Sequence, residues 1–229
     1  MVSTPIQSRI QSLCARIGVA CRDAGRSPAS VTLLAVTKNV GIDTILEAHA
    51  CGQTDFGENY VQEAVSKITQ LRHLPLRWHC IGPVQGNKAK LVAEHFDWVQ
   101  TIDRPKIAQR LNDWRPMDRT PLNVCIQVNI DGGKTKSGVA PDQVLALAQA
   151  VRSMPRLRLK GLMCIPDVSP SFADACAVFQ KARILLDTLN TDGFALDTLS
   201  MGMSGDLEAA IASGSTMLRV GTALFGQRT

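Results

Sequence analysis

The sequence of 229 residues (24.8 kDa) is long enough for one sizeable hydrophobic core and short for two full enzyme domains. Apolar residues at 45% and charged residues at 20% exclude a disordered or fibrous chain. The net charge of +5 is not gathered in blocks, and aromatic residues at 4% are too few for base-stacking platforms. We therefore expect mild attraction to anionic ligands and no nucleic-acid partner.

Cysteine usage and the N-terminus indicate the compartment. The seven cysteines are scattered without a C-x-x-C pair, and several lie inside apolar runs, which favours buried free thiols over a disulfide framework. The N-terminus MVSTPIQSRI lacks the apolar core of a signal peptide, and no stretch approaches the roughly 20 apolar residues of a membrane span. We expect a cytoplasmic protein with no membrane partner.

The first predicted element is a helix near the N-terminus. Thr4 precedes Pro5 and stands three residues before Gln7, which is the spacing of a capping box. Apolar residues then recur with helical period until Gly25, a typical stop signal. The sequence therefore predicts one helix ahead of the first strand.

Beyond this helix, short apolar runs alternate with segments of helical length, such as 42–51, closed by Gly52, and 141–153. The eight runs are residues 31–38, 54–59, 77–82, 98–103, 123–129, 159–165, 197–202 and 216–221. Such alternation implies parallel strands joined by crossovers. The sequence predicts an α/β fold, a single (β/α)8 TIM barrel with an extra N-terminal helix, as one domain over 1–229. A doubly wound open sheet is the alternative.

The barrel prediction places the chemistry at the carboxyl ends of the strands. Lys38 ends the first run, between the apolar residues Val36 and Val40. Burial favours the neutral form of a lysine amine, and only the neutral amine attacks a carbonyl to form a Schiff base. From Lys38 alone, a solvated lysine that marks a strand end is the simpler interpretation.

Small and hydroxyl-bearing residues follow the last two runs. Ser204 and Gly205 precede a helical stretch over 206–212, and Gly221 and Thr222 come at the end of the eighth run. In this fold the loops after strands seven and eight often bind phosphate through backbone N–H groups. Taken singly, Gly221 fits a turn and Ser204 fits a helix N-cap. Their joint placement predicts a phosphate site.

Arg219 lies inside the strongly apolar last run, two residues before Gly221. A guanidinium in a barrel strand is costly unless it is paired or directed at a ligand. We expect it either to donate to a ligand at the barrel mouth or to form an internal ion pair with Glu58 or Asp103. Asn59 either holds a ligand or caps its loop.

We find no sequence motif for another cofactor, a metal ion or a catalytic nucleophile. The sequence contains no G-x-G-x-x-G, H-E-x-x-H or G-x-S-x-G motif. The four histidines show no metal-ligand spacing with one another or with the cysteines, so we expect no metal site. His79 falls in the third run and is expected to be a packed core histidine.

A lysine after strand one, a phosphate site after strands seven and eight, and a buried arginine together resemble the barrel of fold-type III pyridoxal 5′-phosphate (PLP) proteins such as alanine racemase. Longer motifs narrow the resemblance to the pyridoxal phosphate homeostasis protein family. In chain order they are FGENYVQE (56–63), WHCIGPVQGNK (78–88), KSG (136–138), GLMCIP (161–166), LSMGMSGDLEAAI (199–211) and GSTMLRVGTALFG (214–226). The resemblance therefore covers nearly the whole chain.

The resemblance implies a protein that buffers or delivers PLP inside the cell, with PLP-dependent apoenzymes as transient partners and a monomer as the expected state. Lys38 would form the internal aldimine, Arg219 would face the pyridine nitrogen and Asn59 would lie near the ring. The residues implied to hold the phosphate or line the site are Ser200, Met203, Ser204, Gly221 and Thr222. Val40 departs from the family, which commonly has a second lysine there, and this questions any role of a neighbouring amine in cofactor transfer.

The resemblance also bears on turnover. Racemases of this fold type add a β-domain and a catalytic tyrosine, whereas this sequence ends at Thr229, soon after the eighth run, and contains only Tyr60. An arginine at the pyridine nitrogen also disfavours ring protonation. We therefore expect a carrier rather than an enzyme. The alternatives are a small PLP-dependent amino-acid racemase and a class I Schiff-base aldolase, in which Lys38 attacks a sugar phosphate.

Overall fold

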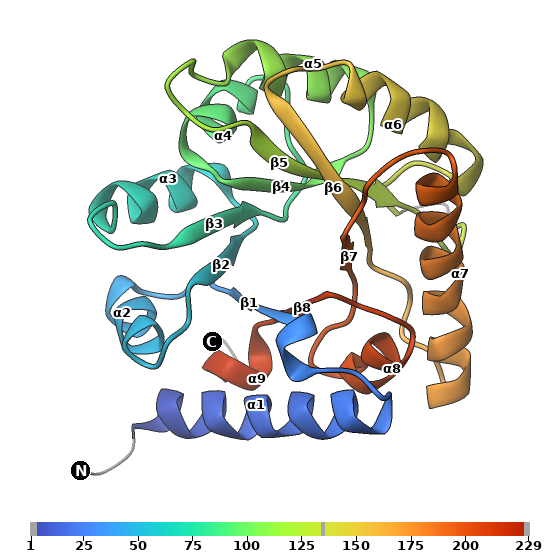
Figure 1. Cartoon of the computed structure of the whole chain (residues 1–229). Helices are drawn as coiled ribbons and strands as arrows, with labels where there is room; N and C mark the ends of the chain where they lie inside the picture. Colours follow the sequence, from blue (N-terminus) through green and yellow to red (C-terminus); the bar gives the residue numbers. More distant parts are fainter. Residues whose placement is uncertain (1–3, 134–135, 227–229) are drawn as a thin grey trace.

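The computed structural model describes residues 4–133 and 136–226. Within these residues, eight strands close into a parallel barrel in which each strand pairs with its neighbours in chain order and β8 pairs with β1. Helices surround the barrel (Figure 1). The predicted (β/α)8 barrel is confirmed, and the open-sheet alternative is wrong.

The strands coincide with the predicted apolar runs. They are β1 Thr32–Val36, β2 Asp55–Glu58, β3 Arg77–Cys80, β4 Trp98–Ile102, β5 Leu122–Val128, β6 Leu157–Cys164, β7 Thr198–Ser200 and β8 Met217–Val220. Each run continues one or two residues beyond the carboxyl end of its strand. These last residues leave the ladder and begin the loops on the face where a barrel carries its chemistry.

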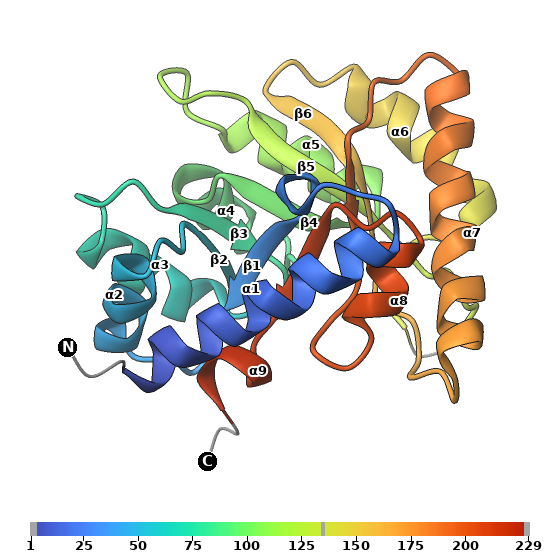
Figure 2. The same ribbon diagram turned by 60° about the horizontal axis from the view of Figure 1, so that its bottom comes forward.

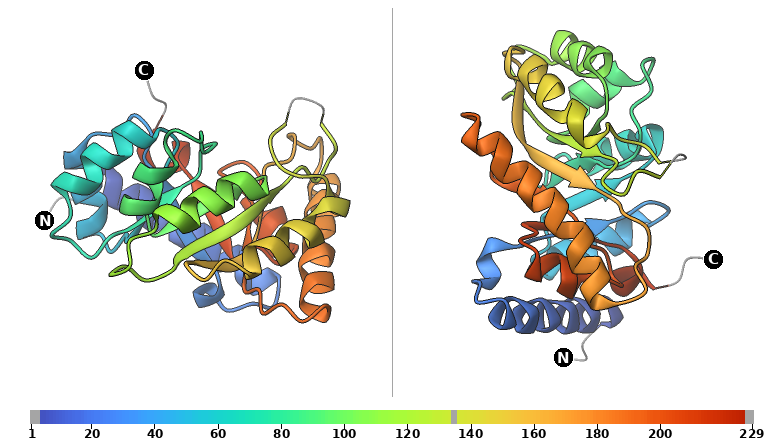
Figure 3. Two further views of the ribbon diagram at one scale, coloured as in Figure 1. Left: turned by 90° about the horizontal axis from the view of Figure 1, so that it is seen from above. Right: turned by 90° about the vertical axis from the view of Figure 1, so that its right-hand side faces the viewer.

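The helices alternate with the strands. They are α1 Pro5–Asp23, α2 Ile42–Ala50, α3 Val61–Gln70, α4 Ala89–His95, α5 Pro105–Trp114, α6 Val144–Arg152, α7 Phe172–Thr191, α8 Leu207–Ala212 and α9 Thr222–Phe225. The helix predicted over 141–153 is divided, because its first turn, Pro141–Gln143, is a 3-10 helix. The long helix α7 lies along β6 and β7 and reaches α8 (Figure 3).

Helix α1 is the predicted extra N-terminal helix. The Thr4 hydroxyl accepts a hydrogen bond from the Gln7 backbone N–H at 3.2 Å, and the helix ends just before Gly25, whose φ is 65°. Its apolar stripe packs against α2, α8 and α9 (Figure 2). Since α8 and α9 are short, α1 covers the side of the barrel that they leave open.

The core contains buried polar side chains and thiols beside its apolar residues. All seven cysteines are free, and Cys21, Cys80, Cys125 and Cys164 are buried, as predicted. Burial raises the pKa of the Cys80 thiol to about 12. His79 is fully buried, which confirms it as a core histidine. In the part of the chain that the structure describes, no helix is long and apolar enough to cross a membrane, and no cluster of side chains offers a metal-ion site.

Candidate functional site

The predicted site residues gather around one cavity at the carboxyl end of the barrel, with a volume of about 340 Å³. Its lining residues are Val36, Lys38, Asn59, Ile81, Ile165, Met203, Ser204, Gly205, Arg219, Gly221 and Thr222. Seven of the eight predicted residues are among them. The exception is Ser200, which is fully buried below the cavity rather than in its lining. The volume is typical of a small-molecule site.

The charge of the lining selects the kind of ligand. Of the described residues that line it, Lys38 and Arg219 are the two cations, and none is a carboxylate. Hydroxyl and glycine residues from the loops after β7 and β8 line the same cavity, and β8 is the strand that pairs with β1. A cavity of this composition suits a small anion with an electrophilic or hydrogen-bonding body.

Lys38 stands in a tight turn that directly follows β1. The backbone N–H of Val40 donates to the Thr37 carbonyl at 3.0 Å, which closes the turn. Asn39 adopts the left-handed conformation, with φ of 57°, and its N–H donates to Glu63 Oε1 at 2.8 Å. Val40 belongs to the hydrophobic core. The position where the family commonly has a second lysine is therefore a packing position in this protein.

A buried ion-pair network supports this turn from below. Lys67 Nζ lies 2.8 Å from the Thr37 carbonyl oxygen, 2.8 Å from Glu58 Oε1 and 2.6 Å from Glu63 Oε1. The Thr37 hydroxyl donates to Glu58 Oε1 at 2.6 Å. Burial raises the pKa of Glu58, although the hydrogen bonds from Lys67 and Thr37 oppose this. Lys67 was not among the residues predicted from the sequence, where its only local signal is its i,i+4 spacing from Glu63.

The loops after β7 and β8 are joined directly to each other. Ser204 Oγ accepts a hydrogen bond from the backbone N–H of Ala223 at 3.4 Å, and Asp206 Oδ1 accepts one from the Met203 N–H at 2.6 Å. Helix α8 begins at Leu207 with Asp206 as its N-cap residue, so the N-cap alternative for Ser204 is wrong. Ser204 instead faces the loop of Gly221, where the phosphate site was predicted.

Arg219 is buried beneath the cavity and held by neutral groups. Its Nη1 donates to Ser200 Oγ at 2.7 Å and its Nη2 to the Cys164 carbonyl at 2.8 Å. The expected ion pair with Glu58 or Asp103 is wrong, because Glu58 pairs with Lys67 and Asp103 with Arg104. Burial lowers the pKa of Arg219. A buried cation with neutral partners is stabilised by a ligand that brings an acceptor.

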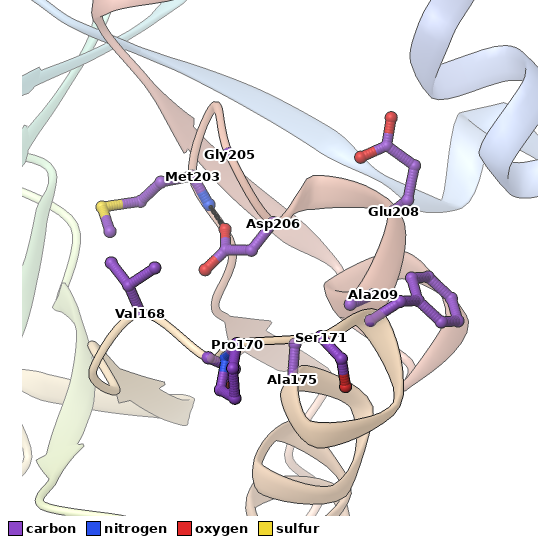
Figure 4. Close-up of a pocket in the computed structure, with 11 residues that line it drawn as sticks. Val168, Pro170, Ser171, Ala175, Met203, Gly205, Asp206, Glu208 and Ala209 are labelled. Atoms are coloured by element: carbon purple, nitrogen blue, oxygen red, sulfur yellow. Dashed lines mark hydrogen bonds between the residues drawn. The ribbon is translucent and has the colours of Figure 1, made fainter.

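A neighbouring cavity of about 380 Å³ shares Met203 and Gly205 with the candidate site. Figure 4 shows that Met203 and Val168 face each other across it, with the Asp206 carboxylate turned to the Met203 N–H. Its charged lining residues are Asp206 and Glu208. An anion is repelled by carboxylates, so the Lys38 cavity is the better candidate despite being smaller.

The barrel places the chain in the class of proteins that contain an alanine racemase N-terminal-like domain. The family model of the alanine racemase N-terminal domain matches residues 19–229. The alanine racemase of Corynebacterium glutamicum superposes with a TM-score of 0.67 at 19% identity, over 95% of this chain and 61% of the racemase. At this identity the likeness shows the barrel fold, and the racemase has much additional chain.

Nearer relatives narrow the class. The pyridoxal phosphate homeostasis protein of Pseudomonas aeruginosa is 54% identical over 223 residues, which cover 97% of this chain and 96% of that protein. PipY of Synechococcus elongatus, solved with PLP bound, has a TM-score of 0.84 at 37% identity, over 96% of this chain and all of PipY. The chain belongs to the pyridoxal phosphate homeostasis protein family. The resemblance predicted from the motifs is confirmed, while the roles of single residues stay predictions.

Proposed function

We propose that this protein binds PLP in the Lys38 cavity and acts in PLP homeostasis by buffering or delivering the cofactor. The observation that carries the proposal is the shared lining of one cavity by Lys38, Arg219 and the Ser204 and Thr222 loops, with no carboxylate among the described residues that line it. The names of the relatives and the PLP-bound structure of PipY support the same ligand.

The residues present fit the chemistry of this ligand. PLP supplies an aldehyde that condenses with a primary amine, and a phosphate dianion. Lys38 provides the amine, and we assign the phosphate to Ser204, Gly221 and Thr222, which line the same cavity. We assign the ring nitrogen to the N–H donors of Arg219. The predicted neighbours Asn59 and Met203 border the same space, and Ser200 contributes through Arg219.

The lining favours a carrier over an enzyme. A guanidinium only donates hydrogen bonds and keeps its proton, so it leaves the ring nitrogen unprotonated and weakens the electron sink. Of the described residues that line the cavity, none is a tyrosine, a histidine or a carboxylate, and Lys38 is the one conventional proton carrier. Tyr60 lines a neighbouring cavity with Asn59. A racemase needs an acid and a base on the two faces of its substrate.

We further propose that the protein is a cytoplasmic monomer that hands PLP to apoenzymes. The free cysteines support a reducing compartment. Light scattering is expected to give the monomer mass of 24.8 kDa. The rate at which a PLP-dependent apoenzyme regains activity should rise when the loaded protein, rather than an equal amount of free PLP at limiting concentration, is the donor.

The experiment that tests the binding proposal is a titration with PLP. We expect a visible absorption band, and after borohydride treatment and digestion a pyridoxyl group on the Lys38 peptide. Lys38→Ala should lose both signals. Lys181→Ala, a matched change on the exposed face of α7, should keep them.

Other outcomes separate the alternatives. A protein that stays colourless with PLP but is trapped on Lys38 by borohydride with a sugar phosphate is an aldolase. Interconversion of D- and L-alanine or serine that Lys38→Ala abolishes identifies a racemase. The proposal would be refuted if the protein showed neither PLP binding nor turnover.

A further inference from the structure

The interior of the barrel holds a continuous chain of hydrogen-bonded side chains that ends at Arg219. His79 Nε2 lies 3.1 Å from Asp55 Oδ1, and His79 Nδ1 lies 3.1 Å from Gln100 Nε2. Gln100 Oε1 lies 2.7 Å from Ser200 Oγ, which lies 2.7 Å from Arg219 Nη1. The five residues come from β2, β3, β4, β7 and β8, and all of them are buried.

Such a chain is unusual in this fold. The interior of a (β/α)8 barrel is normally filled by branched apolar side chains, and each buried polar group lowers stability unless it is fully bonded. The chain of buried side chains starts at the amino-terminal end of the barrel, where Arg77 pairs with Asp55 at 2.5 Å. It ends at Arg219, under the cavity proposed for PLP. Such a polar connection has a function if Arg219, at the cavity end of the chain, depends on it.

Asp55 and His79, at the start of this hydrogen-bond chain, determine which atoms carry protons. Burial opposes ionisation of Asp55, but hydrogen bonds from Arg77 and His79 hold its pKa below the usual range, so it is a carboxylate and only accepts. Burial lowers the pKa of His79 despite the bond to Asp55, so the ring is neutral. His79 must therefore donate from Nε2 and accept at Nδ1.

A neutral His79 determines the rest of the chain. Only the amide NH2 of Gln100 can donate to an accepting Nδ1, so the Gln100 carbonyl oxygen faces Ser200. The Ser200 hydroxyl donates to that oxygen and keeps a lone pair for Arg219. If the Gln100 amide were turned over, Gln100 and Arg219 would both present N–H groups to Ser200 Oγ. Every hydrogen bond thus points from Arg219 toward Asp55.

We propose that Gln100 is a positioning residue for PLP binding: it orients Ser200, and through it the Arg219 guanidinium, while His79 holds the Gln100 amide in the required orientation. This inference rests on the proposed binding of PLP. With Nη1 held by Ser200 and Nη2 by the Cys164 carbonyl, the plane of the guanidinium is fixed, and Arg219 is one of the residues that line the cavity.

The first test compares two buried glutamines. Gln100→Leu keeps the size of the side chain and removes the amide, and we expect PLP affinity to fall about tenfold, the equivalent of one hydrogen bond to a charged group. The absorption band of bound PLP should shift as it does in Arg219→Met. The control Gln53→Leu removes an amide that binds the Leu33 and Asp55 carbonyl groups, so it should lower the thermal midpoint without changing affinity or absorption.

A double-mutant cycle separates positioning from general damage. In an Arg219→Met background, Gln100→Leu should cause no further loss of PLP affinity, because the residue it orients is gone. The same loss in both backgrounds, or no loss in either, would overturn the proposal. If Gln100→Leu does not fold, Ser200→Ala interrupts the chain one step nearer to Arg219 and is expected to behave in the same way.

The direction of the chain has its own spectroscopic test, which needs no PLP. Nitrogen-15 NMR of the His79 ring near neutral pH should show the neutral tautomer with the proton on Nε2. A charged ring, or a proton on Nδ1, would overturn the assignment of Gln100. If wild-type protein does not bind PLP but His79 shows the expected tautomer, the proposed function fails while the hydrogen-bond chain stands.

Discussion

Replacing Lys67 by methionine tests how the Lys38 turn is held. The change keeps the length of the side chain but removes the ammonium that joins Glu58 to the Thr37 carbonyl. Removing one partner of a buried ion pair typically costs about 3–5 kcal/mol. Glu58 limits the loss by taking up a proton, which costs about 1.4 kcal/mol for each pH unit above its ordinary pKa of 4.5. We therefore expect a loss of about 3 kcal/mol near pH 7.

The loss should shrink in acid. Burial already raises the pKa of Glu58, and removing the cation of Lys67 raises it further. A carboxyl whose pKa is raised by folding stabilises the protein below its unfolded pKa, and this stability is lost as pH rises toward the folded pKa. The variant is therefore expected to lie within about 1 kcal/mol of wild type near pH 5 and to fall behind toward pH 7.

Urea unfolding at the two pH values measures this difference. Lys90→Met is the matched control, because Lys90 and Glu94 form an exposed pair at 3.9 Å that contributes less than about 0.5 kcal/mol. A titration should also show weaker PLP binding in Lys67→Met, since the turn that carries Lys38 loses its support. A loss below about 1 kcal/mol near pH 7, or one that does not shrink toward pH 5, would refute this account of the turn.

Two further predictions concern backbone packing and acid stability. An added Cβ at Gly82 would lie 2.2 Å from the Asn59 carbonyl oxygen, so Gly82→Ala should weaken PLP binding and lower the thermal midpoint, whereas Gly41→Ala, with open space around its Cβ, should change neither appreciably. Arg77 and His79 hold the pKa of Asp55 below its usual 3.8 against the effect of burial, so the stability that Asp55 contributes is present above that pH and is lost as pH falls. The unfolding free energy of Asp55→Asn should therefore change less than that of wild type between about pH 5 and about pH 3; an equal change in both proteins would contradict the assignment.

The sequence was sufficient for the barrel because parallel strands are buried on both faces and read as separate apolar runs. The order of those runs also placed Lys38 and Thr222 at the same end, which is why most of the predicted site residues share one cavity. The motifs likewise indicated the family to which the chain belongs.

Hydrogen-bond partners that lie far apart in the sequence could not be predicted from local sequence patterns. Arg219 was expected to pair with Glu58 or Asp103, but a guanidinium can reach several strands, and the structure gives it Ser200 and the Cys164 carbonyl. Gln100 and Ser200 are a hundred residues apart and show no local pattern. Their relation depends on the closure of the barrel, which brings β4 and β7 face to face across the interior.

The two cations of the site are kept available for an anion in different ways. Glu58 and Glu63 lie close to the Lys38 turn, but each carboxylate has its Oε1 oxygen bound to Lys67 and is therefore already paired with a cation other than Lys38. Arg219 is fixed by a hydroxyl and a carbonyl. A carboxylate in direct contact with either cation would compete with the phosphate or ring of a ligand.

The carboxylate of the barrel interior, Asp55, lies at the opposite end of the hydrogen-bond chain from Arg219. Asp55 is separated from Arg219 by three neutral side chains, so the charge of the guanidinium is polarised toward Asp55 without being cancelled at the cavity. Moving that carboxylate up the chain, by Ser200→Asp, should therefore abolish PLP binding even if the protein folds, because the cation would then be satisfied before the ligand arrives. Retained affinity in this variant would show that the charge of Arg219 is not what the site offers to PLP.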